Sequence, residues 1–493
     1  MPARYMCIRT KTQKFPSGPR ESCRHFSQRY TTAEDYPYQL NTAFFYESVN
    51  MDVTKVIELR QKLMSPTYAS FQTFKAPVVI ERASGQYCYG PNGEKYLDLL
   101  ASNLTISVGH AHPRVTAAAI AQIAKAPHLS SMYYSEPASF LSEKLLATLA
   151  PRSDGEQWQV LYAVTGTEAV EIALQMARVS TGNMSLLSLT NSYHGSYGTA
   201  MGVTGVKACR HDLPETHGIH HLQAPIYEFK DEIDKLISMA ETTINSATSG
   251  KISAFIFEVL QGYGGIHVLP DDYLRKMSNL IHKYGGLVIA DEVQTGYGRM
   301  GKSFWAFQMS GIEPDIIVTA KGLGCGFPIS AVIAKESVFK NFNETGKFVF
   351  STYGANPVSA AAACAVLDVI RDEKIQERAG YLGDLVKKHL MFVMQTFDLC
   401  IEVRGCGLMW GIELDTSIAS QVFEALKDLN FLVGLGGGKK NVLRIMPPMC
   451  ITEADIDNFA EVLINTMDKF TVRLAQSNTT AEEFKQIPDS NQK

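Results

Sequence analysis

The sequence predicts an α/β protein in which helices cover a mostly parallel β-sheet, followed by a smaller α+β domain. From Val160 onward, short runs rich in β-branched residues alternate with runs of helical period. That alternation is typical of parallel strands joined by covering helices. After about Leu382 the chain changes to a helix, two strand candidates interrupted by glycine, and a last amphipathic helix, which predicts the second domain.

The predicted elements follow the chain in a regular order. In the first domain they are a strand at 160–164, a helix at 168–178, a strand at 255–260, a helix at 271–284, and strands at 287–290, 316–319 and 329–333. The smaller domain has strands at 402–414 and 431–446 and a helix from about 453. The helix at 271–284 has the clearest ends, because Pro270 precedes it and Gly285-Gly286 follows it.

Composition and charge exclude several classes of partner. The 493 residues are 45% hydrophobic and carry a net charge of −4, so no positive excess favours nucleic acid or an anionic membrane, and a small-molecule partner is expected. The longest apolar candidate, 358–370, is too short for a membrane span and contains Asp368. The nine cysteines are odd in number and form no Cys-x-x-Cys pair, which favours a reducing compartment over a disulfide framework.

The N-terminal segment has the composition of a mitochondrial transit peptide. Residues 1–33 hold seven basic residues and one acidic residue, with frequent Ser and Thr and no apolar core. Arg24-His25-Phe26-Ser27 resembles a processing site, so we expect the protein in the mitochondrial matrix. Two alternatives stay open: a disordered basic tail, or a shorter cytosolic form that starts at Met51.

Three residues near predicted strand ends suit one type of cofactor. The strand at 160–164 enters a helix through Thr165, which forms a capping box with Glu168, and the N–H groups of such a helix start can bind a phosphate group. Asp291 ends one strand and Lys321 follows the next. A phosphate site, an acid and a lysine at one sheet edge suit pyridoxal 5'-phosphate, which has a phosphate, a basic ring nitrogen and an aldehyde. A plain salt bridge between Asp291 and Lys321 is the alternative.

A Gly-rich segment at 296–303 satisfies two phosphate-binding patterns, Gly-x-x-x-x-Gly-Lys-Ser and Gly-x-Gly-x-x-Gly. Both patterns need a strand that runs directly into the glycines and a helix that leaves them. Here residues 291–295 separate the strand from Gly296, and Phe304-Trp305 follows the segment. We therefore predict a Gly-rich surface turn, with a P-loop nucleotidase as the remote alternative.

Seven motifs follow one another along the chain: Ser107-Val108-Gly109-His110-Ala111-His112-Pro113, Thr165-Gly166-Thr167-Glu168-Ala169, Tyr193-His194-Gly195, Asp291-Glu292-Val293-Gln294-Thr295-Gly296-Tyr297-Gly298-Arg299, Ala320-Lys321-Gly322, Thr352-Tyr353-Gly354-Ala355-Asn356-Pro357 and Leu443-Arg444-Ile445-Met446-Pro447-Pro448. Together and in this order they resemble the class III pyridoxal-phosphate aminotransferases, from about Ser65 to Phe470, and most of all their mitochondrial alanine:glyoxylate members.

The resemblance implies the fold-type I architecture, with a seven-stranded mostly parallel sheet in the large domain. It also implies an active site that lies between the large and small domains and across a homodimer, or a dimer of dimers. We divide the chain accordingly into a transit segment at 1–33, a segment at 34–100 that contributes to the small domain, a large cofactor-binding domain at 101–375, a C-terminal small domain at 376–475 and a flexible tail at 476–493.

The resemblance assigns catalytic and phosphate-binding roles. Lys321 binds the cofactor aldehyde covalently and, once displaced by the substrate amine, moves the proton that defines transamination. Asp291 pairs with the ring nitrogen and keeps it protonated, so that the ring accepts electrons. Gly166 and Thr167 hold the phosphate, and Thr352 reaches the phosphate of the partner chain.

The remaining site residues surround the ring and the substrate. By the same resemblance, Val293 and Tyr193 pack on the two faces of the cofactor ring, and Gln294 donates a hydrogen bond to the phenolic oxygen of the ring. His194 and Glu258 complete the cofactor-binding set. Arg444 binds the substrate carboxylate, because its planar guanidinium makes two parallel charge-assisted bonds. The substrates are then small amino acids and 2-oxo acids, such as alanine with glyoxylate or pyruvate.

This sequence departs from the family pattern beside that arginine. Position 263 is Tyr where ornithine- and γ-aminobutyrate-using relatives have a glutamate that masks the arginine. Arg444 is therefore expected to stay open, which favours small α-amino acids over a strict ω-amino acid transaminase for β-alanine or 3-aminoisobutyrate. A phospho-lyase acting on phosphorylated amines is a further alternative, and Arg444 argues against it. The changes at Val170, Val259 and Ala355 have no clear interpretation.

Other notable residues have simpler structural interpretations. His217, His220 and His221 lack the spacing of a metal site, so no metal is expected. Cys325 is expected to be a small buried residue. The Gly436–Lys440 run is expected to be a turn between two strands.

Overall fold

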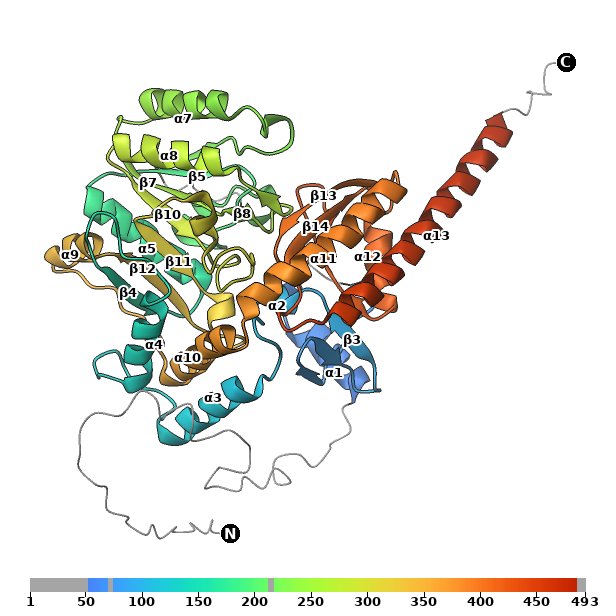
Figure 1. Ribbon diagram of the computed structural model, residues 1–493, viewed down its shortest axis with the longest axis horizontal. Coiled ribbons are helices and arrows are strands. Elements are labelled where there is room, and N and C mark those ends of the chain that lie inside the picture. Colours follow the sequence, from blue (N-terminus) through green and yellow to red (C-terminus); the bar gives the residue numbers. More distant parts are fainter. Residues whose placement is uncertain (1–51, 70–73, 212–216, 486–493) are drawn as a thin grey trace, which may run out of the picture. The chain divides into compact units, whose positions relative to one another are not determined.

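A seven-stranded sheet forms the centre of the computed structural model, which describes residues 52–69, 74–211 and 217–485 (Figure 1). In spatial order its strands are β4 (Trp158–Ala163), β12 (Ser330–Lys335), β11 (Ile316–Thr319), β10 (Leu287–Asp291), β7 (Ile252–Phe257), β5 (Ser185–Leu189) and β6 (Ile219–Leu222). Only β12 runs antiparallel to its neighbours, which confirms the mostly parallel sheet.

Helices cover both faces of this sheet because side chains alternate along each buried strand. Ala254 and Ile256 of β7 pack in the same apolar cluster as helix α5, whereas Phe255 and Phe257 point into the cluster of helix α8. The helices of the α5 layer are α5 (Gly166–Thr181), α6 (Gly198–Val203) and α9 (Glu336–Glu344), and those of the opposite layer are α7 (Ile233–Ala247) and α8 (Asp271–Lys283) (Figure 1). Three further helices pack on one another: α3 (Pro113–Lys125), α4 (Glu136–Leu146) and α10 (Pro357–Asp372).

The C-terminal part contains a four-stranded antiparallel sheet. Its strands, in spatial order, are β13 (Cys400–Cys406), β14 (Met409–Leu414), β17 (Val442–Ile445) and β16 (Gly434–Gly436), and its helices are α11 (Ile375–Thr396), α12 (Ala419–Asp428) and α13 (Glu453–Lys485). The single strand predicted at 402–414 is wrong, because a turn at Gly407 divides it into a hairpin. Gly407 has a φ of 53°, and a Cβ there would lie 2.2 Å from the carbonyl oxygen of Arg299, so the position requires glycine.

The strand predicted at 431–446 is also divided, into β15 (Phe431–Leu432), β16 and β17. β15 leaves the C-terminal sheet and pairs in parallel with β3, next to the hairpin strands of the N-terminal segment. These strands are β1 (Arg82–Ser84), β2 (Tyr87–Tyr89) and β3 (Lys95–Asp98). Residues 97–98 therefore lie in one sheet with residues from the far end of the chain.

The remaining elements are α1 (Val53–Leu63), the short turn α2 (Ala101–Leu104), β8 (Leu260–Gln261) and β9 (His267–Val268). Helix α13 continues into the segment predicted to be a flexible tail, and the predicted transit segment lies outside the described residues. The domain boundaries stay predictions. Among the described helices, none is both long and apolar enough to cross a membrane.

Candidate active site

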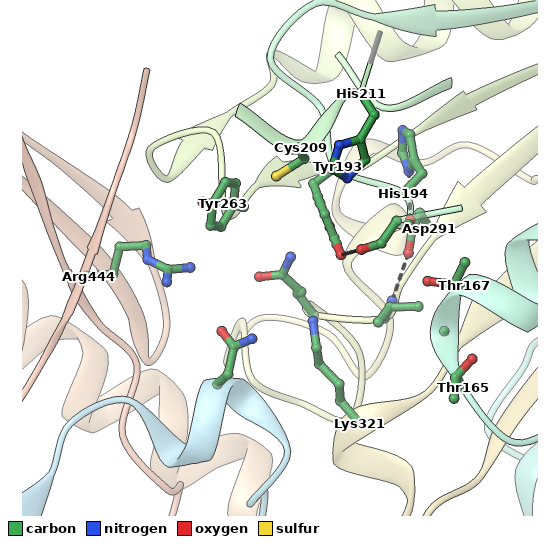
Figure 2. Close-up of a pocket in the computed structure, with 16 residues that line it drawn as sticks. Thr165, Thr167, Tyr193, His194, Cys209, His211, Tyr263, Asp291, Lys321 and Arg444 are labelled. Carbon is green, nitrogen blue, oxygen red and sulfur yellow. Dashed lines mark hydrogen bonds and ion pairs between the residues drawn. The ribbon is translucent and has the colours of Figure 1, made fainter. Parts of the chain in front are cut away.

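A cavity of about 340 Å³ lies where β10, β11 and the start of α5 meet β17 (Figure 2). Nine of the eleven predicted site residues line it: Gly166, Thr167, Tyr193, His194, Asp291, Val293, Gln294, Lys321 and Arg444. Figure 2 shows Arg444 at one end, Thr165 and Thr167 at the other, and Lys321 between them. The size suits a small ligand bound together with a cofactor-sized group.

The start of α5 forms the first end of the cavity. Thr165 caps the helix, since its hydroxyl accepts a hydrogen bond from the Glu168 N–H at 3.2 Å. The predicted capping box is only half formed: the Glu168 carboxylate accepts from the Val164 N–H, one residue before the cap. A Cβ on Gly166 would lie 3.2 Å from Val293, so glycine allows the helix start and the strand-end loop to approach closely. The free N–H groups and the helix dipole make this end suitable for an anion.

Asp291, at the end of β10, is held by two hydrogen bonds. His194 Nδ1 donates to one carboxylate oxygen at 2.7 Å, and the Val293 N–H donates to the other at 3.1 Å. Both side chains are almost completely buried. In this arrangement His194 carries a proton on Nδ1. The two hydrogen bonds together hold the Asp291 carboxylate in one orientation in the cavity.

Lys321 begins the turn that follows β11 and has a φ of 41°, a left-handed conformation that costs free energy in a residue other than glycine. Burial lowers the pKa of its amine to about 8, although the nearby Asp291 and Glu258 favour the charged form. At pH 7 about a tenth of this amine is therefore neutral, far more than for an ordinary lysine, and only the neutral form acts as a nucleophile or base.

Glu258 lies behind the cavity and does not line it. Its carboxylate accepts hydrogen bonds from the N–H groups of Tyr193 at 2.9 Å and Gly262 at 3.2 Å. Burial raises its pKa to about 7. Glu258 thus holds the segments of Tyr193 and Gly262 in this structure, and its predicted cofactor contact stays a prediction.

Arg444 forms the opposite end of the cavity and is completely buried. No carboxylate pairs with it among the described residues, and its Nε and Nη2 groups have no hydrogen-bond partner there. The ring of Tyr263 lies 5.4 Å from the guanidinium carbon and contacts the cation through its face. Burial lowers the pKa of Arg444 to about 10, so it stays charged at neutral pH. The predicted masking by an acidic residue is absent among the described residues, and the binding of a substrate carboxylate by Arg444 stays a prediction.

The unpaired groups show that the cavity fits a polar ligand. Besides Arg444, Gln294 Oε1 and His194 Nε2 are buried without a partner in the described part of the chain. Buried polar groups are nearly always hydrogen-bonded in the functional state of a protein. An anion site, a buried acid, a partly neutral lysine and these unpaired groups together match the phosphate, ring nitrogen and aldehyde of pyridoxal phosphate.

Comparison with known proteins also indicates an enzyme that uses pyridoxal phosphate. The model of the family described as aminotransferase class-III matches residues 68–467. The chain belongs to the class III aminotransferases. It is 34% identical to alanine–glyoxylate aminotransferase 2 homolog 2, mitochondrial, of Arabidopsis thaliana, over 86% of this chain and 89% of that protein. It is 31% identical to human alanine–glyoxylate aminotransferase 2, mitochondrial, over 87% of this chain and 89% of that protein.

Solved structures of transaminases are similar to this chain as well. An amine transaminase from an uncultivated Pseudomonas species, in its pyridoxal-phosphate-bound form, superposes with a TM-score of 0.74 at 26% identity, over 80% of this chain and 95% of that one. The protein is thus a transaminase of the fold-type I architecture that uses pyridoxal phosphate and acts on amino and oxo acids.

The Gly-rich segment of this class III aminotransferase is not a nucleotide site. No α-helix leaves the glycines: a short 3-10 helix, Ala306–Ser310, follows only after Phe304-Trp305. The segment is a turn, as predicted, but Arg299 and Met300 within it are buried, so its predicted surface position is wrong there. Arg299 donates to the carbonyl oxygens of Leu408 at 3.1 Å and Pro447 at 2.9 Å. The segment therefore fixes the C-terminal sheet, which carries Arg444, against the loop that follows Asp291.

The other predictions have mixed outcomes. Thr352 is exposed and does not line the cavity of its own chain. His221 forms a hydrogen bond with the Ser188 hydroxyl at 3.0 Å. Cys325 is buried, as expected. Residues 437–441 join β16 to β17, also as expected.

Besides Ser196, which directly follows the motif at 193–195, three cavity residues were missed by the sequence analysis: Asn103, Cys209 and His211. None of them follows a predicted strand or starts a predicted helix, and the local sequence around them has no ligand-binding pattern. Only tertiary contacts bring them to the cavity.

Proposed function

We propose that this class III aminotransferase transfers the amino group of a small α-amino acid such as alanine to a 2-oxo acid such as glyoxylate or pyruvate. The observation that carries the proposal is Arg444, a buried cation with no carboxylate partner among the described residues. A buried unpaired charge is costly, and a substrate carboxylate compensates it through two parallel hydrogen bonds. The names of the plant and human relatives support the same pair of substrates.

The residues around the cavity divide the work of holding the cofactor. Gly166 and Thr167 bind the phosphate at the start of α5. Asp291, oriented by His194, pairs with the ring nitrogen. Tyr193 and Val293 cover the two ring faces, and Gln294 bonds the phenolic oxygen. When bound, pyridoxal phosphate supplies a ring that withdraws electrons from the substrate Cα.

Lys321 supplies the base. Its neutral amine, favoured by the lowered pKa, removes the proton from the substrate Cα and returns a proton to complete amino transfer. Arg444 holds the carboxylate meanwhile and fixes the Cα near this amine. Tyr263, which has no negative charge at neutral pH, leaves Arg444 available to both the amino and the oxo acid.

Two alternatives differ in the substrate. An ω-amino acid transaminase for β-alanine or 3-aminoisobutyrate uses the same cavity with a longer donor. A phospho-lyase needs no arginine for a carboxylate, so the open Arg444 argues against it. Release of phosphate from phosphoethanolamine would identify the lyase directly.

We further propose a homodimer in which Thr352 completes the phosphate site of the partner. Apolar side chains around Thr352 are exposed in the single chain: Met132, Tyr133, Tyr134, Phe348, Phe350 and Tyr353. The two segments that carry them lie together, because Asn356 donates to the Pro127 carbonyl at 3.0 Å and His128 packs on Tyr353. Exposed apolar patches of this kind mark association surfaces.

Complementation between two inactive variants tests the shared site. In a mixed dimer of Lys321→Ala and Thr352→Ala chains, one of the two sites has both native residues if Thr352 acts across the interface. Refolding the variants together should then restore activity that neither has alone. Absence of restoration in a verified mixed dimer would place Thr352 outside the partner's site.

We also propose a location in the mitochondrial matrix. The basic composition of residues 1–33 and the mitochondrial names of both relatives support it. Import into isolated mitochondria, with and without residues 1–33, tests the proposal. Equal import of both forms would contradict a transit role for this segment.

The visible absorption spectrum tests the activity. The purified protein should have a yellow band that bleaches with excess L-alanine and returns with glyoxylate, whereas Lys321→Ala should show neither response. A stable band that ignores both compounds would refute the alanine:glyoxylate assignment. A colourless protein that cannot be reconstituted would refute cofactor binding.

A further inference from the structure

The turn α2 is left-handed throughout. Ala101, Ser102, Asn103 and Leu104 have φ angles of 51°, 46°, 61° and 69°, and none of them is glycine. A left-handed turn costs roughly 1–2 kcal/mol per residue for ordinary L-amino acids, although Asn tolerates it better than most. Such conformations persist only where surrounding contacts hold them, and they concentrate at binding sites.

Asp98 is the group that holds the turn. One carboxylate oxygen accepts from the N–H groups of Leu100 at 3.0 Å and Ala101 at 2.8 Å, and the other accepts from Ser102 at 3.2 Å. His110 Nε2 binds the second oxygen at 2.8 Å. Both Asp98 and His110 are nearly buried, so the carboxylate is fixed from two directions.

Cys88 lies beside this pair, and Cys88, Asp98 and His110 together have the spacing of metal ligands. The contacts favour a structural explanation. Both Asp98 oxygens already accept hydrogen bonds, and the Cys88 thiol has its pKa raised to about 12 by burial, so it is not the thiolate that a metal needs. We therefore interpret the three residues as the support of the left-handed turn.

The turn brings Asn103 to the wall of the cavity, in a segment bonded to the one that follows Arg444. Asn103 lines the same cavity as Lys321 and Arg444. The two backbone segments are joined directly, because the Met446 N–H, two residues beyond Arg444, donates to the Leu99 carbonyl at 2.7 Å. Asn103 is half-buried in the wall of this cavity.

We propose that the Asn103 amide donates a hydrogen bond to the substrate carboxylate alongside Arg444, and that the left-handed turn positions it for this contact. The inference rests on the proposed function. A carboxylate has about four lone-pair sites, of which Arg444 satisfies two, so a buried carboxylate needs further donors. The amide supplies a donor without adding a charge, which lets the pocket accept the amino acid and the oxo acid in turn.

Two glycine variants of the holoenzyme separate the amide from the backbone. Asn103→Gly keeps a residue that accepts the left-handed φ but removes the amide, while Ser102→Gly makes the same backbone change at an exposed residue that does not line the cavity. We expect Asn103→Gly to raise the KM for alanine and the inhibition constant of propionate about tenfold or more. Ser102→Gly should leave both constants unchanged, and neither variant should change the spectrum of the resting enzyme.

Asn103→Asp adds a second check, because a carboxylate in nearly the same shape should repel the substrate carboxylate and weaken propionate further. Equal constants in Asn103→Gly and Ser102→Gly would overturn the inference, and so would a loss of the resting spectrum in Asn103→Gly, which would assign the amide to the cofactor. Wild-type enzyme without alanine–glyoxylate turnover would instead refute the proposed function, so the two failures are distinguishable.

Discussion

The two ends of the cavity are built in different ways. At the phosphate end, Gly166 and Thr167 start helix α5, and Asp291 ends strand β10. At the substrate end, Arg444 lies in a short strand, Tyr263 lies in the loop between β8 and β9, and Asn103 lies in a left-handed turn. The proposed phosphate end therefore rests on termini of regular elements, whereas the proposed substrate end adds a loop and a left-handed turn to one strand residue, and such irregular segments can vary without disturbing the central sheet.

The largest expected loss of activity follows substitution of Lys321, which lies between the two ends of the cavity (Figure 2). Lys321→Ala should lower kcat by at least about a thousandfold, because it removes the base and the covalent attachment together. Steady-state turnover of alanine and glyoxylate measures the loss. Lys302→Ala is the matched control: this lysine is exposed in the Gly-rich segment and should be silent. A loss of activity in Lys302→Ala would revive the nucleotide-site interpretation.

This contrast also explains what could be predicted from the sequence. The strand ends at Asp291 and Lys321 and the helix start at Thr165 follow from local patterns of apolar and capping residues. The role of Arg299 depends on carbonyl oxygens of Leu408 and Pro447, more than a hundred positions along the chain, so local patterns contain no sign of it.

The left-handed turn was equally hidden. Residues 101–104 have no glycine, and glycine is the usual sequence sign of a positive φ. The turn depends on Asp98 and His110, whose pairing is a tertiary contact. The hairpin at Gly407 was missed for a related reason, since a close approach to Arg299 decides that position.

The substrate end should respond to changes in affinity rather than in rate. Arg444→Lys keeps the charge but loses one of two parallel hydrogen bonds, so the KM for alanine and for glyoxylate should rise about ten- to a hundredfold. The resting spectrum should stay as in the wild type, because the phosphate end is untouched. A variant with unchanged KM but a lost cofactor band would show that the two ends are not independent.

A smaller effect concerns pH. The pKa of Lys321 is lowered to about 8 from its ordinary value. The fraction of the amine that is neutral therefore rises about tenfold per pH unit below pH 8 and changes little above it. We expect the rate of cofactor uptake by the apoprotein to rise from pH 6 and level off above about 8. Stopped-flow absorbance measures this rate. A rate that keeps rising to pH 10 would mean that burial does not shift this lysine.

The smallest effect concerns the strained turn itself. Ser102→Gly should stabilise the protein by about 1 kcal/mol, because glycine adopts the φ of 46° without the cost that serine has there. The melting temperature of the holoenzyme should rise by about 1 °C. Ser153→Gly, at a surface residue outside the left-handed set, serves as the comparison and should give no gain. A lower melting temperature in Ser102→Gly would show that the serine side chain stabilises the turn.

The parallel pairing of β3 with β15 has a consequence for how the enzyme is made. Within one chain, the phosphate end uses residues of the continuous stretch from β4 to β12, which a ribosome completes before the C-terminal strands. The segment that leads to Asn103 is held by the carbonyl or N–H groups of Leu432, Met446 and Met449, which are synthesised last. Contacts between distant parts of a chain form slowly. We therefore expect the proposed substrate end to form only after the C-terminal strands have been made, later than the helix and strand ends of the phosphate end.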